Sequence, residues 1–227
     1  MTEISSPRWP RGLRLFPAAL DTAAQAELLE AVVELIGEAP FFTPRMPRWG
    51  RPFSVRMSNF GPLGWVSDIS GYRYQRHHPE TERPWPPMPQ ALLDMWDTFA
   101  RWPAPPQAAL VNHYRPGARM SLHVDRDERD LRAPILSISL GDDALFRIGG
   151  PQRRDPTCSL RLRAGDILLM AGAARRCHHG IDRIYPGTAR LPRAIGEGRI
   201  NITLRRIDPP SAQASRHPCA IQPSRGA

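Results

Sequence analysis

Lysine is absent from this sequence. All 31 basic residues are arginine, they stand against 22 acidic residues, and the net charge is +9. Without lysine the protein cannot use a Schiff base, a P-loop lysine or a lysine general base. The codon preference of a GC-rich genome accounts for arginine in place of lysine, but it does not account for the net charge. A positive surplus favours partners such as nucleic acid or an anionic membrane through long-range attraction.

Cysteine and long apolar runs are also scarce. The three cysteines, Cys158, Cys177 and Cys219, form no CxxC pair and are odd in number, which argues against a disulfide framework and a structural zinc site. No stretch approaches the ~20 apolar residues that span a bilayer. The first residues, MTEISSPRWP, lack the apolar core of a signal peptide. We therefore expect a cytoplasmic protein that does not enter a membrane.

Two amphipathic helices are predicted in the first half of the chain. The first opens at a capping box over 22–25, carries apolar residues at helical spacing over 28–36, and ends before Pro40. The second has Pro89 in its first turn and an apolar face that reaches Phe99. Both patterns are typical of helices that support a core.

The rest of the chain has the pattern of β structure. Residues 41–90 are rich in Pro, Gly and aromatic residues, which indicates short strands and long loops. From residue 108, short alternating segments follow one another between Gly, Pro and Asp turns, and they predict an antiparallel sandwich or barrel with flanking helices. The Pro- and Ser-rich residues 208–227 predict a disordered tail. The predicted strands are 108–114, 120–125, 134–141, 144–150, 158–163, 166–172 and 199–205.

A histidine and an aspartate in one strand are the first candidates for chemistry. His123 and Asp125 are two residues apart, so their side chains point to the same face. They supply two of the three ligands of a 2-His-1-carboxylate site, which leaves open positions on Fe(II). By itself this pair is weak evidence, because a solvated His and Asp would look the same. A third ligand could come from His178 or His179, and since neighbours on a strand face opposite ways, only one of them can join the site.

The segment RINITLR, residues 199–205, alternates completely between polar and apolar side chains. Its polar face has an arginine at each end, Arg199 and Arg205. Arginine binds carboxylates in a planar, paired manner, so this face suits a short dicarboxylate. An exposed polar strand face is the alternative interpretation. Asn112 and Tyr114 share one face of another strand and are further candidates for the same ligand.

Taken together, the segments NHYRPGARMSLHVDRDERDLRAPI, HHG and RINITLR closely resemble the AlkB family of Fe(II)/2-oxoglutarate-dependent nucleic-acid dealkylases, and in particular its bacterial members that repair alkylated DNA. The similarity extends over residues 40–206 and includes MSNFGPLGW, GYRYQ and PWPPMPQ. It implies a double-stranded β-helix, or jelly roll, over 108–207. Residues 1–20 would be an N-terminal extension, and 21–107 would hold the support helices and a nucleotide-recognition lid.

The resemblance also implies roles for individual residues. It selects His179 over His178, because the family's ligand is the histidine directly before glycine. Trp65 would stack on a flipped base, Tyr72 would touch the nucleic-acid backbone, Asp127 would meet an exocyclic amino group, and Glu128 would stand behind it. The implied iron ligands are His123, Asp125 and His179. The implied 2-oxoglutarate residues are Asn112, Tyr114, Arg199, Asn201 and Arg205. The candidates for phosphate contacts are Arg51, Arg73, Arg76 and Arg153.

The implied reaction is oxidative demethylation with Fe(II), 2-oxoglutarate and O₂. The methyl group of N1-methyladenine or N3-methylcytosine, in single- or double-stranded DNA or in RNA, would be hydroxylated and leave as formaldehyde, with release of succinate and CO₂. The base must leave the duplex to reach the metal, and a cationic methylated ring suits a carboxylate and an aromatic face. We expect the enzyme to act as a monomer.

Two alternatives remain open from the sequence. The chain could be a 2-oxoglutarate oxygenase that acts on RNA, protein or a small molecule, or a jelly-roll binding module without its metal. One departure from the family also needs structural explanation. Cys177 and His178 stand where relatives carry bulky aromatic residues, which would change the wall of the iron pocket and expose Cys177 to oxidation.

Overall fold

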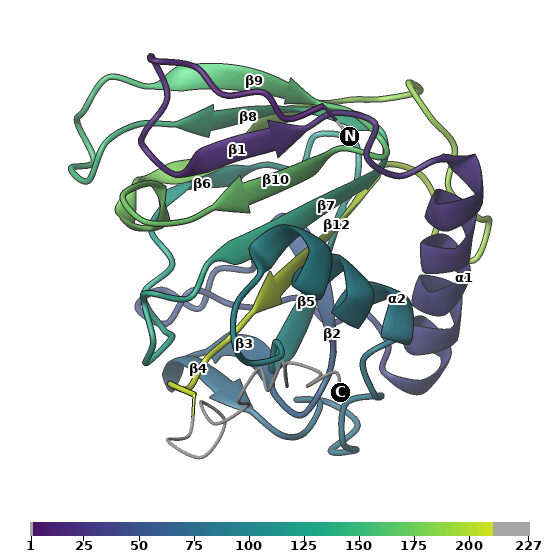
Figure 1. The fold of residues 1–227 in the computed structure, drawn as a ribbon. Helices are drawn as coiled ribbons and strands as arrows, with labels where there is room; N and C mark the ends of the chain where they lie inside the picture. Colours follow the sequence, from purple (N-terminus) through teal and green to yellow (C-terminus); the bar gives the residue numbers. More distant parts are fainter. Residues whose placement is uncertain (1, 211–227) are drawn as a thin grey trace, which may run out of the picture.

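The computed structural model describes residues 2–210 and has two antiparallel sheets and a separate hairpin as its main elements (Figure 1). The larger sheet has the strand order β1-β10-β7-β12-β5-β2, and the smaller has the order β6-β11-β8-β9. Within the larger sheet the strands are β1 (Leu13–Phe16), β2 (Val55–Phe60), β5 (Ala108–Tyr114), β7 (Ile135–Gly141), β10 (Ile167–Met170) and β12 (Arg199–Arg205). The smaller sheet holds β6 (Met120–His123), β8 (Asp143–Ile148), β9 (Cys158–Leu162) and β11 (His179–Tyr185), and the hairpin is β3 (Gly64–Asp68) with β4 (Gly71–Gln75).

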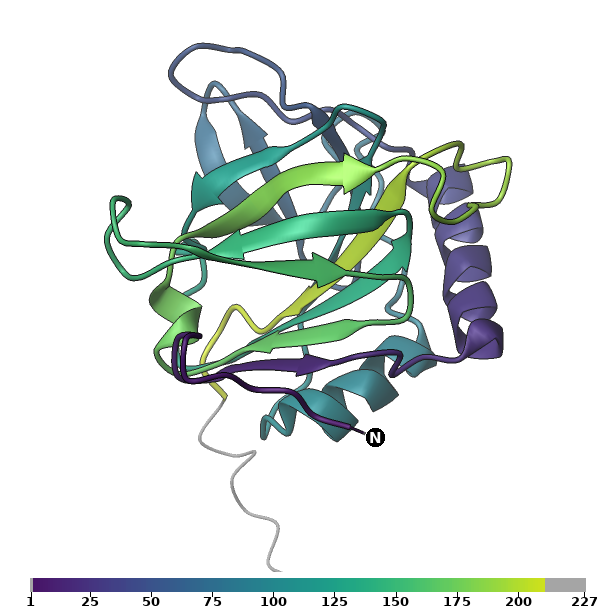
Figure 2. The same ribbon diagram turned by 90° about the horizontal axis from the view of Figure 1, so that it is seen from above.

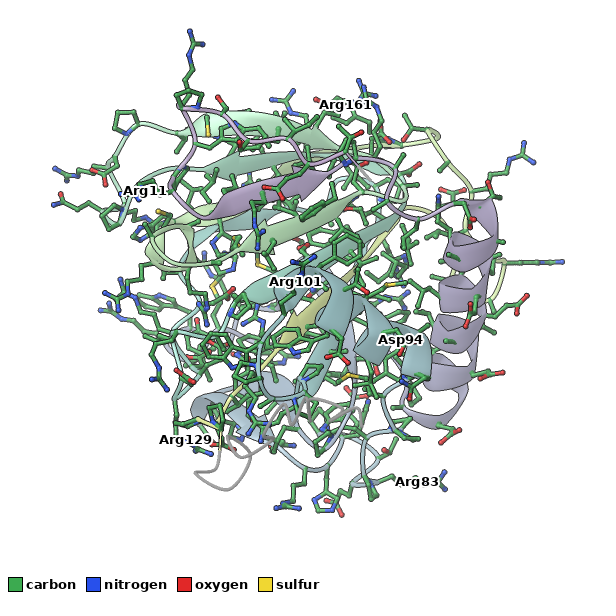
Figure 3. All side chains as sticks on the ribbon, in the orientation of Figure 1. Arg11, Arg83, Asp94, Arg101, Arg129 and Arg161 are labelled. Carbon is green, nitrogen blue, oxygen red and sulfur yellow. The ribbon has the colours of Figure 1, made fainter. Side chains whose placement is uncertain are left out.

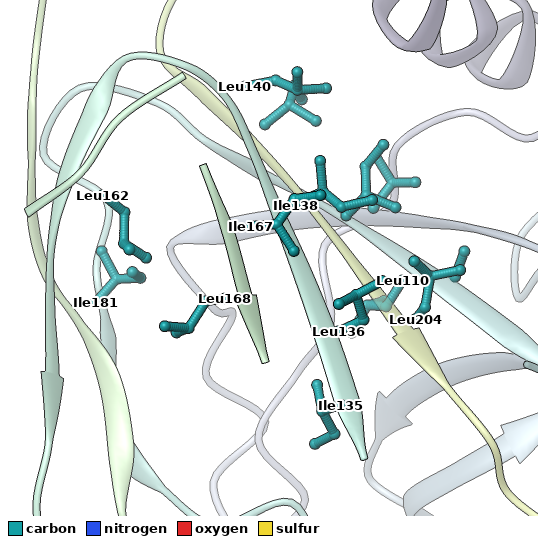
Figure 4. Packing of buried hydrophobic residues seen from close by; sticks show 14 of the residues in the cluster. Leu110, Ile135, Leu136, Ile138, Leu140, Leu162, Ile167, Leu168, Ile181 and Leu204 are labelled. Carbon is teal, nitrogen blue, oxygen red and sulfur yellow. The ribbon is translucent and has the colours of Figure 1, made fainter. Parts of the chain in front are cut away.

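The two sheets face each other across a shared interior, as a double-stranded β-helix requires. Leu162 of β9 and Ile181 of β11 come from the smaller sheet, Leu168 of β10 comes from the larger one, and all three line the same cavity (Figure 4). This arrangement confirms the predicted mainly-β class. It also means that residues far apart in the chain can converge on one interior site.

Strand β12 shows how the sequence divides the larger sheet into two faces. Ile200, Ile202 and Leu204 are fully buried in the apolar core. The intervening polar residues point the other way, into the interior between the sheets, where Arg199 and Arg205 line the cavity. Because side chains alternate along a strand, a single segment supplies both the packing of the core and the polar surface of a site.

Helix α1 (Thr22–Glu38) lies at one end of the sheets and buries Leu28, Val32 and Leu35 (Figure 1). The predicted capping box over 22–25, which would make Thr22 the N-cap, is wrong, because the helix begins at Thr22 itself. The N-cap is Asp21, whose carboxylate accepts a hydrogen bond from the Ala24 amide at 2.9 Å. Aspartate is a strong N-cap because its oxygen satisfies an amide that has no partner within the helix.

Helix α2 (Gln90–Met95) continues into the π-helical turn η1 (Trp96–Ala100), and together they cover the outer face of the larger sheet (Figure 1). Trp96 is completely buried, and Phe99 packs edge-on against Phe16 with ring centroids 5.0 Å apart. The remaining helical element is the 3₁₀ turn η2 (Ala174–Arg176), just before β11. No helix within the described residues is long and apolar enough to cross a membrane.

Two strands of the larger sheet come from segments outside the predicted jelly-roll core. β1 lies inside the segment 1–20, for which the sequence shows no period, and it pairs with β10 at one edge. β2 lies inside the segment 21–107 and pairs with β5 at the other edge. Four residues are too few to reveal an alternation, which explains why β1 escapes sequence analysis. Of the predicted tail, residues 211–227 lie outside the described part of the chain.

Candidate metal and co-substrate site

His123, Asp125 and His179 form a three-residue cluster at the edge of the smaller sheet. Each offers one ligand atom, and these atoms all lie within 4.8 Å of one another. His123 on β6 is the register partner of His179 on β11, so the two rings stand side by side with centroids 4.6 Å apart. The two carboxylate oxygens of Asp125 lie 3.6 Å from His123 Nε2 and 3.4 Å from His179 Nε2. The structure thus brings His179, and not His178, to the predicted pair.

The hydrogen bonds of the cluster fit a metal ion. His123 Nδ1 lies 2.9 Å from the Ser121 carbonyl and His179 Nδ1 lies 3.0 Å from the Cys177 carbonyl. A carbonyl only accepts, so both Nδ1 atoms carry hydrogen, which leaves the two Nε2 atoms facing the centre as the nitrogens that could bind a metal. Asp125 Oδ2 is buried and accepts no well-aligned hydrogen bond among the described residues, although the Arg205 guanidinium lies 3.0 Å away. Two imidazoles and one carboxylate with open positions are the donor set typical of a non-haem Fe(II) site.

The protonation states of the cluster agree with this interpretation. Partial burial, together with the neighbouring His179 ring, lowers the pKa of His123 to about 4, so its ring is neutral near neutral pH. Burial acts to raise the pKa of Asp125, but the Arg205 guanidinium and the two histidines hold it well below its ordinary value. The cluster therefore offers a neutral His123 imidazole and an ionised Asp125 carboxylate, the forms that bind a metal.

The polar face of β12 meets polar residues of the strands on either side of it. Asn201 lies opposite Asn112 of β5, and its amide donates to Ser137 Oγ at 2.8 Å and to the Ile138 carbonyl at 3.0 Å. Arg199 lies opposite Tyr114, which is also buried. Burial raises the pKa of Tyr114 to about 12, so its phenol remains a hydrogen-bond donor. The predicted 2-oxoglutarate residues are thus gathered on adjacent strands of one sheet.

Arg199 is a buried cation that contacts no carboxylate among residues 2–210. The residue is 0% exposed, and its guanidinium bonds only to neutral oxygens, Ser139 Oγ at 2.7 Å and the Asp142 carbonyl at 3.2 Å. Its Nε has no partner among the described residues, and burial lowers its pKa to about 10. Burying a charge is costly unless an opposite charge accompanies it. A ligand carboxylate in the cavity would supply the missing partner.

Arg205, at the other end of β12, belongs to a dense buried network. Its guanidinium lies 2.8 Å from Glu128 Oε1 and 3.0 Å from Asp125 Oδ2. Glu128 also binds Arg175 at 2.7 Å and accepts a hydrogen bond from the Tyr74 hydroxyl at 2.5 Å. Arg175 in turn donates to the Asp125 backbone carbonyl at 2.8 Å. The network joins the lid hairpin, the metal cluster and the co-substrate strand.

The network defines the surroundings of Glu128, which is predicted to stand behind Asp127. Its side chain is completely buried, and Glu128 is not among the residues that line the cavity, so it does not face a substrate. It compensates the charges of Arg205 and Arg175 instead. Sequence reasoning did not identify Tyr74 or Arg175 at all. The only signal for Tyr74 is that it alternates with Tyr72 in the segment GYRYQ, and such alternation does not reveal which side chain is inward.

A single cavity of about 640 Å³ contains the metal cluster and the polar face of β12. At its mouth lie the lid residues Trp65 and Tyr72 together with Asp127. The Trp65 indole donates to Asp127 Oδ2 at 2.7 Å, and the Tyr72 ring stacks on Trp65 with centroids 5.6 Å apart. The structure therefore places all three predicted base-contacting residues at the entrance to the cavity.

The arginines predicted to touch phosphates differ in their surroundings. Arg51 and Arg76 are exposed. Arg153 lines the cavity and donates to the Leu122 carbonyl at 3.0 Å. Arg73 does not fit the prediction, because its guanidinium binds both carboxylate oxygens of Asp68, at 3.0 and 2.8 Å, across the β3–β4 turn. Arg73 therefore stabilises the turn of the β3–β4 hairpin, and its charge is already paired with that of Asp68.

Cys177 and His178 do not change the wall of the iron pocket. Neither lines the cavity, and Cys177 is buried with its thiol directed to the Ala173 carbonyl. Burial raises the pKa of this thiol, which disfavours the reactive thiolate. The expectation that Cys177 is exposed to oxidation is therefore wrong for the structure as it stands.

Comparison with known proteins agrees with this site. Residues 12–205 match the family described as the 2OG-Fe(II) oxygenase superfamily. The chain is 55% identical over 195 residues to an "Alpha-ketoglutarate-dependent dioxygenase AlkB homolog" of Caulobacter vibrioides, covering 86% of this chain and 87% of that protein. It is 41% identical over 168 residues to "Alpha-ketoglutarate-dependent dioxygenase AlkB" of Escherichia coli, covering 72% and 77%. The structure titled "The structure of OsALKBH1" superposes with a TM-score of 0.73 at 26% identity, over 90% of this chain and 100% of that one.

Proposed function

We propose that the substrate of this chain is an N-alkylated base in nucleic acid. The chain belongs to the 2OG-Fe(II) oxygenase superfamily and, within it, to the AlkB family. It is therefore a dioxygenase that uses Fe(II), 2-oxoglutarate and O₂. N1-methyladenine and N3-methylcytosine are the bases that we favour, in DNA or RNA and in single or double strands. The proposal also includes the predicted monomer and a cytoplasmic site of action. Curated relatives at lower identity carry names such as "tRNA demethylase abh1" and "DNA N(6)-methyladenine demethylase ALKBH1A".

The observation that carries the proposal is the pairing of Trp65 with Asp127 at the mouth of the cavity. One oxygen of Asp127 is held by the Trp65 indole at 2.7 Å, which leaves the other oxygen to accept from an amino group. Both favoured bases are cationic after methylation and carry an exocyclic amino group. A carboxylate beside an aromatic face is therefore complementary in charge and shape to this ring.

Within this proposal His123, Asp125 and His179 hold the iron, and the polar face of β12 holds 2-oxoglutarate. Arg199 with Tyr114 would bind the distal carboxylate of the co-substrate, because this buried cation has no other anionic partner among the described residues. Arg205 orients the Asp125 carboxylate, which lies 3.0 Å away. The iron, when bound with its co-substrate, supplies the oxidation of an unactivated C–H bond as 2-oxoglutarate is converted to succinate and CO₂.

The protein's own contribution on the substrate side is to receive a base that has left its stack. Tyr72 covers one face of Trp65, so an incoming base uses the opposite face or displaces the exposed Tyr72 ring. Stacking on an aromatic ring offsets the energy of unstacking, and this energy is lowest for a damaged base. Once the methyl group is hydroxylated, the resulting hemiaminal releases formaldehyde and the unmodified base.

A lesion panel tests this proposal. The protein, loaded with Fe(II) and 2-oxoglutarate, is incubated with single- and double-stranded oligonucleotides that carry N1-methyladenine or N3-methylcytosine. We expect release of formaldehyde and loss of 14 mass units from the oligonucleotide, because one CH₂ is removed. Absence of release from every member of the panel, by a protein that still converts 2-oxoglutarate to succinate, would contradict the proposed substrate.

The variant Asp127→Ala separates base recognition from oxygen chemistry. We expect demethylation to fall by 10- to 100-fold, the range for loss of a hydrogen bond to a charged group. The rate of succinate formation in the absence of nucleic acid should stay within about twofold of the wild-type rate, because Asp127 does not belong to the metal cluster. Equal losses in both assays would indicate that Asp127 supports the fold and not the base.

A further inference from the structure

The loop between α1 and β2 carries an exposed tryptophan among arginines. Trp49 is 66% exposed, although tryptophan is normally well covered. The segment TPRMPRWGRP, residues 43–52, contains Arg45, Arg48 and Arg51, all exposed, and no acidic residue. We call residues 45–51 the Trp49 loop. Its composition, a flat aromatic ring among cations, is unlike the rest of the lid.

Hydrogen bonds hold the Trp49 loop to the lid hairpin. The Arg45 amide donates to the Ser67 carbonyl at 2.9 Å, and the Ser67 hydroxyl donates to the Arg45 carbonyl at 2.6 Å. Within the loop, the Met46 amide donates to the Arg51 carbonyl and the Gly50 amide to the Met46 carbonyl, both at 2.8 Å. The Arg45 guanidinium closes the loop by donating to the Gly50 carbonyl at 3.0 Å. The ring of Trp49 is therefore presented to solvent by a tied loop and not by a loose segment.

The arginines of the loop form no ion pair within the part of the chain that the structure describes. No acidic side chain lies within 4.0 Å of Arg45, Arg48 or Arg51 among residues 2–210, in contrast to Arg73 of the neighbouring hairpin. The Arg48 guanidinium lies over the Trp49 ring, 4.7 Å from its centroid. An arginine on one face of an indole leaves the other face available to stack on a further ring.

The Trp49 loop also borders the mouth of the cavity. Met46, Pro52 and Phe53 line that cavity, and the Phe53 ring lies 6.2 Å from the Trp65 ring. In Figure 2 the loop that precedes β2, coloured dark blue, projects at the top of the view beyond the β3–β4 hairpin. The loop therefore lies beside the place where a flipped base would reach Trp65.

We infer that the Trp49 loop is a second binding site for nucleic acid, at which Trp49 stacks on a base of a single strand next to the flipped base while Arg48 and Arg51 contact its phosphates. The inference rests on the proposed function and makes it more specific. Every base has a flat face, so a stacking site of this kind binds without reading sequence. Bases of an intact duplex are already stacked on their neighbours, so the loop favours single strands over duplexes.

Binding measurements test the inference without any catalysis. We would follow the fluorescence anisotropy of an unmethylated single-stranded oligonucleotide of about 12 nucleotides, a length within the site sizes of stacking proteins, on the iron-free protein. Trp49→Ala should raise the Kd about tenfold, and Trp49→Phe should retain most of the affinity. The Kd for a duplex of the same sequence should change by less than about twofold, the smallest difference that such titrations resolve.

Charge is tested separately with a matched control. Replacing Arg48 and Arg51 by Gln should reduce the slope of log K against log salt by about 1.4, because each phosphate contact to a single strand contributes about 0.7. Arg11→Gln is the control. Arg11 is exposed, and it precedes β1, at the sheet edge opposite to β2 (Figure 3). This control should change the slope by less than about 0.3, since it removes no phosphate contact.

The outcomes separate this inference from the proposed function. An unchanged single-strand Kd for Trp49→Ala, with wild-type Tm, overturns the inference, and so does an equal loss for duplex and single strand. Binding of an acidic peptide that depends on Trp49 more than binding of the oligonucleotide does would also overturn it. If Trp49→Ala weakens single-strand binding but no methylated base is ever repaired, the inference stands and the proposed function fails. If methylated bases are repaired but the single-strand Kd does not depend on Trp49, the proposed function stands and the inference fails.

Discussion

The two ends of strand β12 carry the same side chain in opposite circumstances. Arg205 is buried between the carboxylates of Asp125 and Glu128, at 3.0 and 2.8 Å. Arg199 is buried as deeply but bonds only to a serine hydroxyl and a backbone carbonyl. The protein completes the charge balance at the end near the metal cluster and leaves it incomplete at the other end. Both arginines line the cavity with an Nε that has no partner among the described residues, but only Arg205 already contacts carboxylates of the protein there.

The largest loss of stability should follow from replacing Arg205, at the end of β12 where protein carboxylates balance the charge. Arg205→Gln leaves the carboxylates of Asp125 and Glu128 buried without their shared cation, so we expect the free energy of unfolding to fall by about 3–5 kcal/mol. Urea denaturation measures this loss. Arg199→Gln is the matched variant and should change the same quantity by less than about 1 kcal/mol, because among the described residues no carboxylate is in direct contact with the charge that it removes. Equal losses for the two variants would remove the distinction between the two ends.

The second largest effect concerns Arg199, at the other end of β12, and the binding of 2-oxoglutarate. Arg199→Gln should raise the KM for 2-oxoglutarate on the order of 100-fold, because a charge-assisted pair with the distal carboxylate is lost. Succinate formation as a function of 2-oxoglutarate concentration gives this value. Ser139→Ala serves as a milder control, since it removes only the 2.7 Å bond that positions the guanidinium. A KM unaffected by Arg199→Gln would show that the carboxylate binds elsewhere.

The dependence of stability on pH sharpens the same comparison. Despite burial, which acts to raise them, the cations around Asp125 and Glu128 hold both carboxyl pKa values below their ordinary values of 3.8 and 4.5. A lowered pKa in the folded state stabilises the protein above the unfolded-state value, and this stability is lost as the pH falls through the folded-state value. Wild-type protein should therefore lose stability steeply below about pH 4. Arg205→Gln should show a shallower loss, and Arg199→Gln should follow the wild type.

The smallest effect concerns the contact of Tyr74, on the β3–β4 hairpin, with the buried network around Arg205. Tyr74→Phe removes the hydroxyl that donates to Glu128 at 2.5 Å, while the ring remains. We expect a loss of about 1 kcal/mol in the free energy of unfolding, typical of one buried hydrogen bond. Tyr72→Phe is the control on the same strand, and it should have no measurable effect because this residue is exposed. If both variants behave alike, Tyr74 does not connect the hairpin to the network.

The contrast between the two ends also explains what the sequence predicts and what it misses. The alternation of residues 199–205 predicts the faces of β12 correctly, because strand periodicity is a local property. The partners of Arg205 are not local: Glu128 lies 77 residues away in the chain and Tyr74 lies 131 away. No spacing rule connects such positions. The residues alone therefore suggest a carboxylate ligand for both arginines, while the structure shows that one of them already has its carboxylates.

The metal cluster, too, is predicted only as far as local sequence patterns reach. A local i, i+2 pattern predicts the pair His123 and Asp125, although the predicted strand 120–125 is wrong at its end, because β6 ends at His123 and Asp125 lies beyond it. Residues alone leave His178 and His179 equivalent, and only the register of β11 against β6 places His179 beside His123. The edge strand β1 escapes prediction for a different reason, since its four residues acquire strand geometry only by pairing with β10. Short elements that depend on a distant partner carry little information in their own sequence.

The hydrogen bond between Trp65 and Asp127 has a consequence for how this pair of positions can change over evolutionary time. Phenylalanine at position 65 would keep an aromatic face but leave the carboxylate without its 2.7 Å donor. Alanine at position 127 would leave the indole N–H of the buried Trp65 without this acceptor. Each position therefore constrains the other, and viable changes at the two sites are expected to occur together. Among relatives of this chain, the range of accepted bases should accordingly shift in steps, when both residues are exchanged, and not by gradual drift at either one.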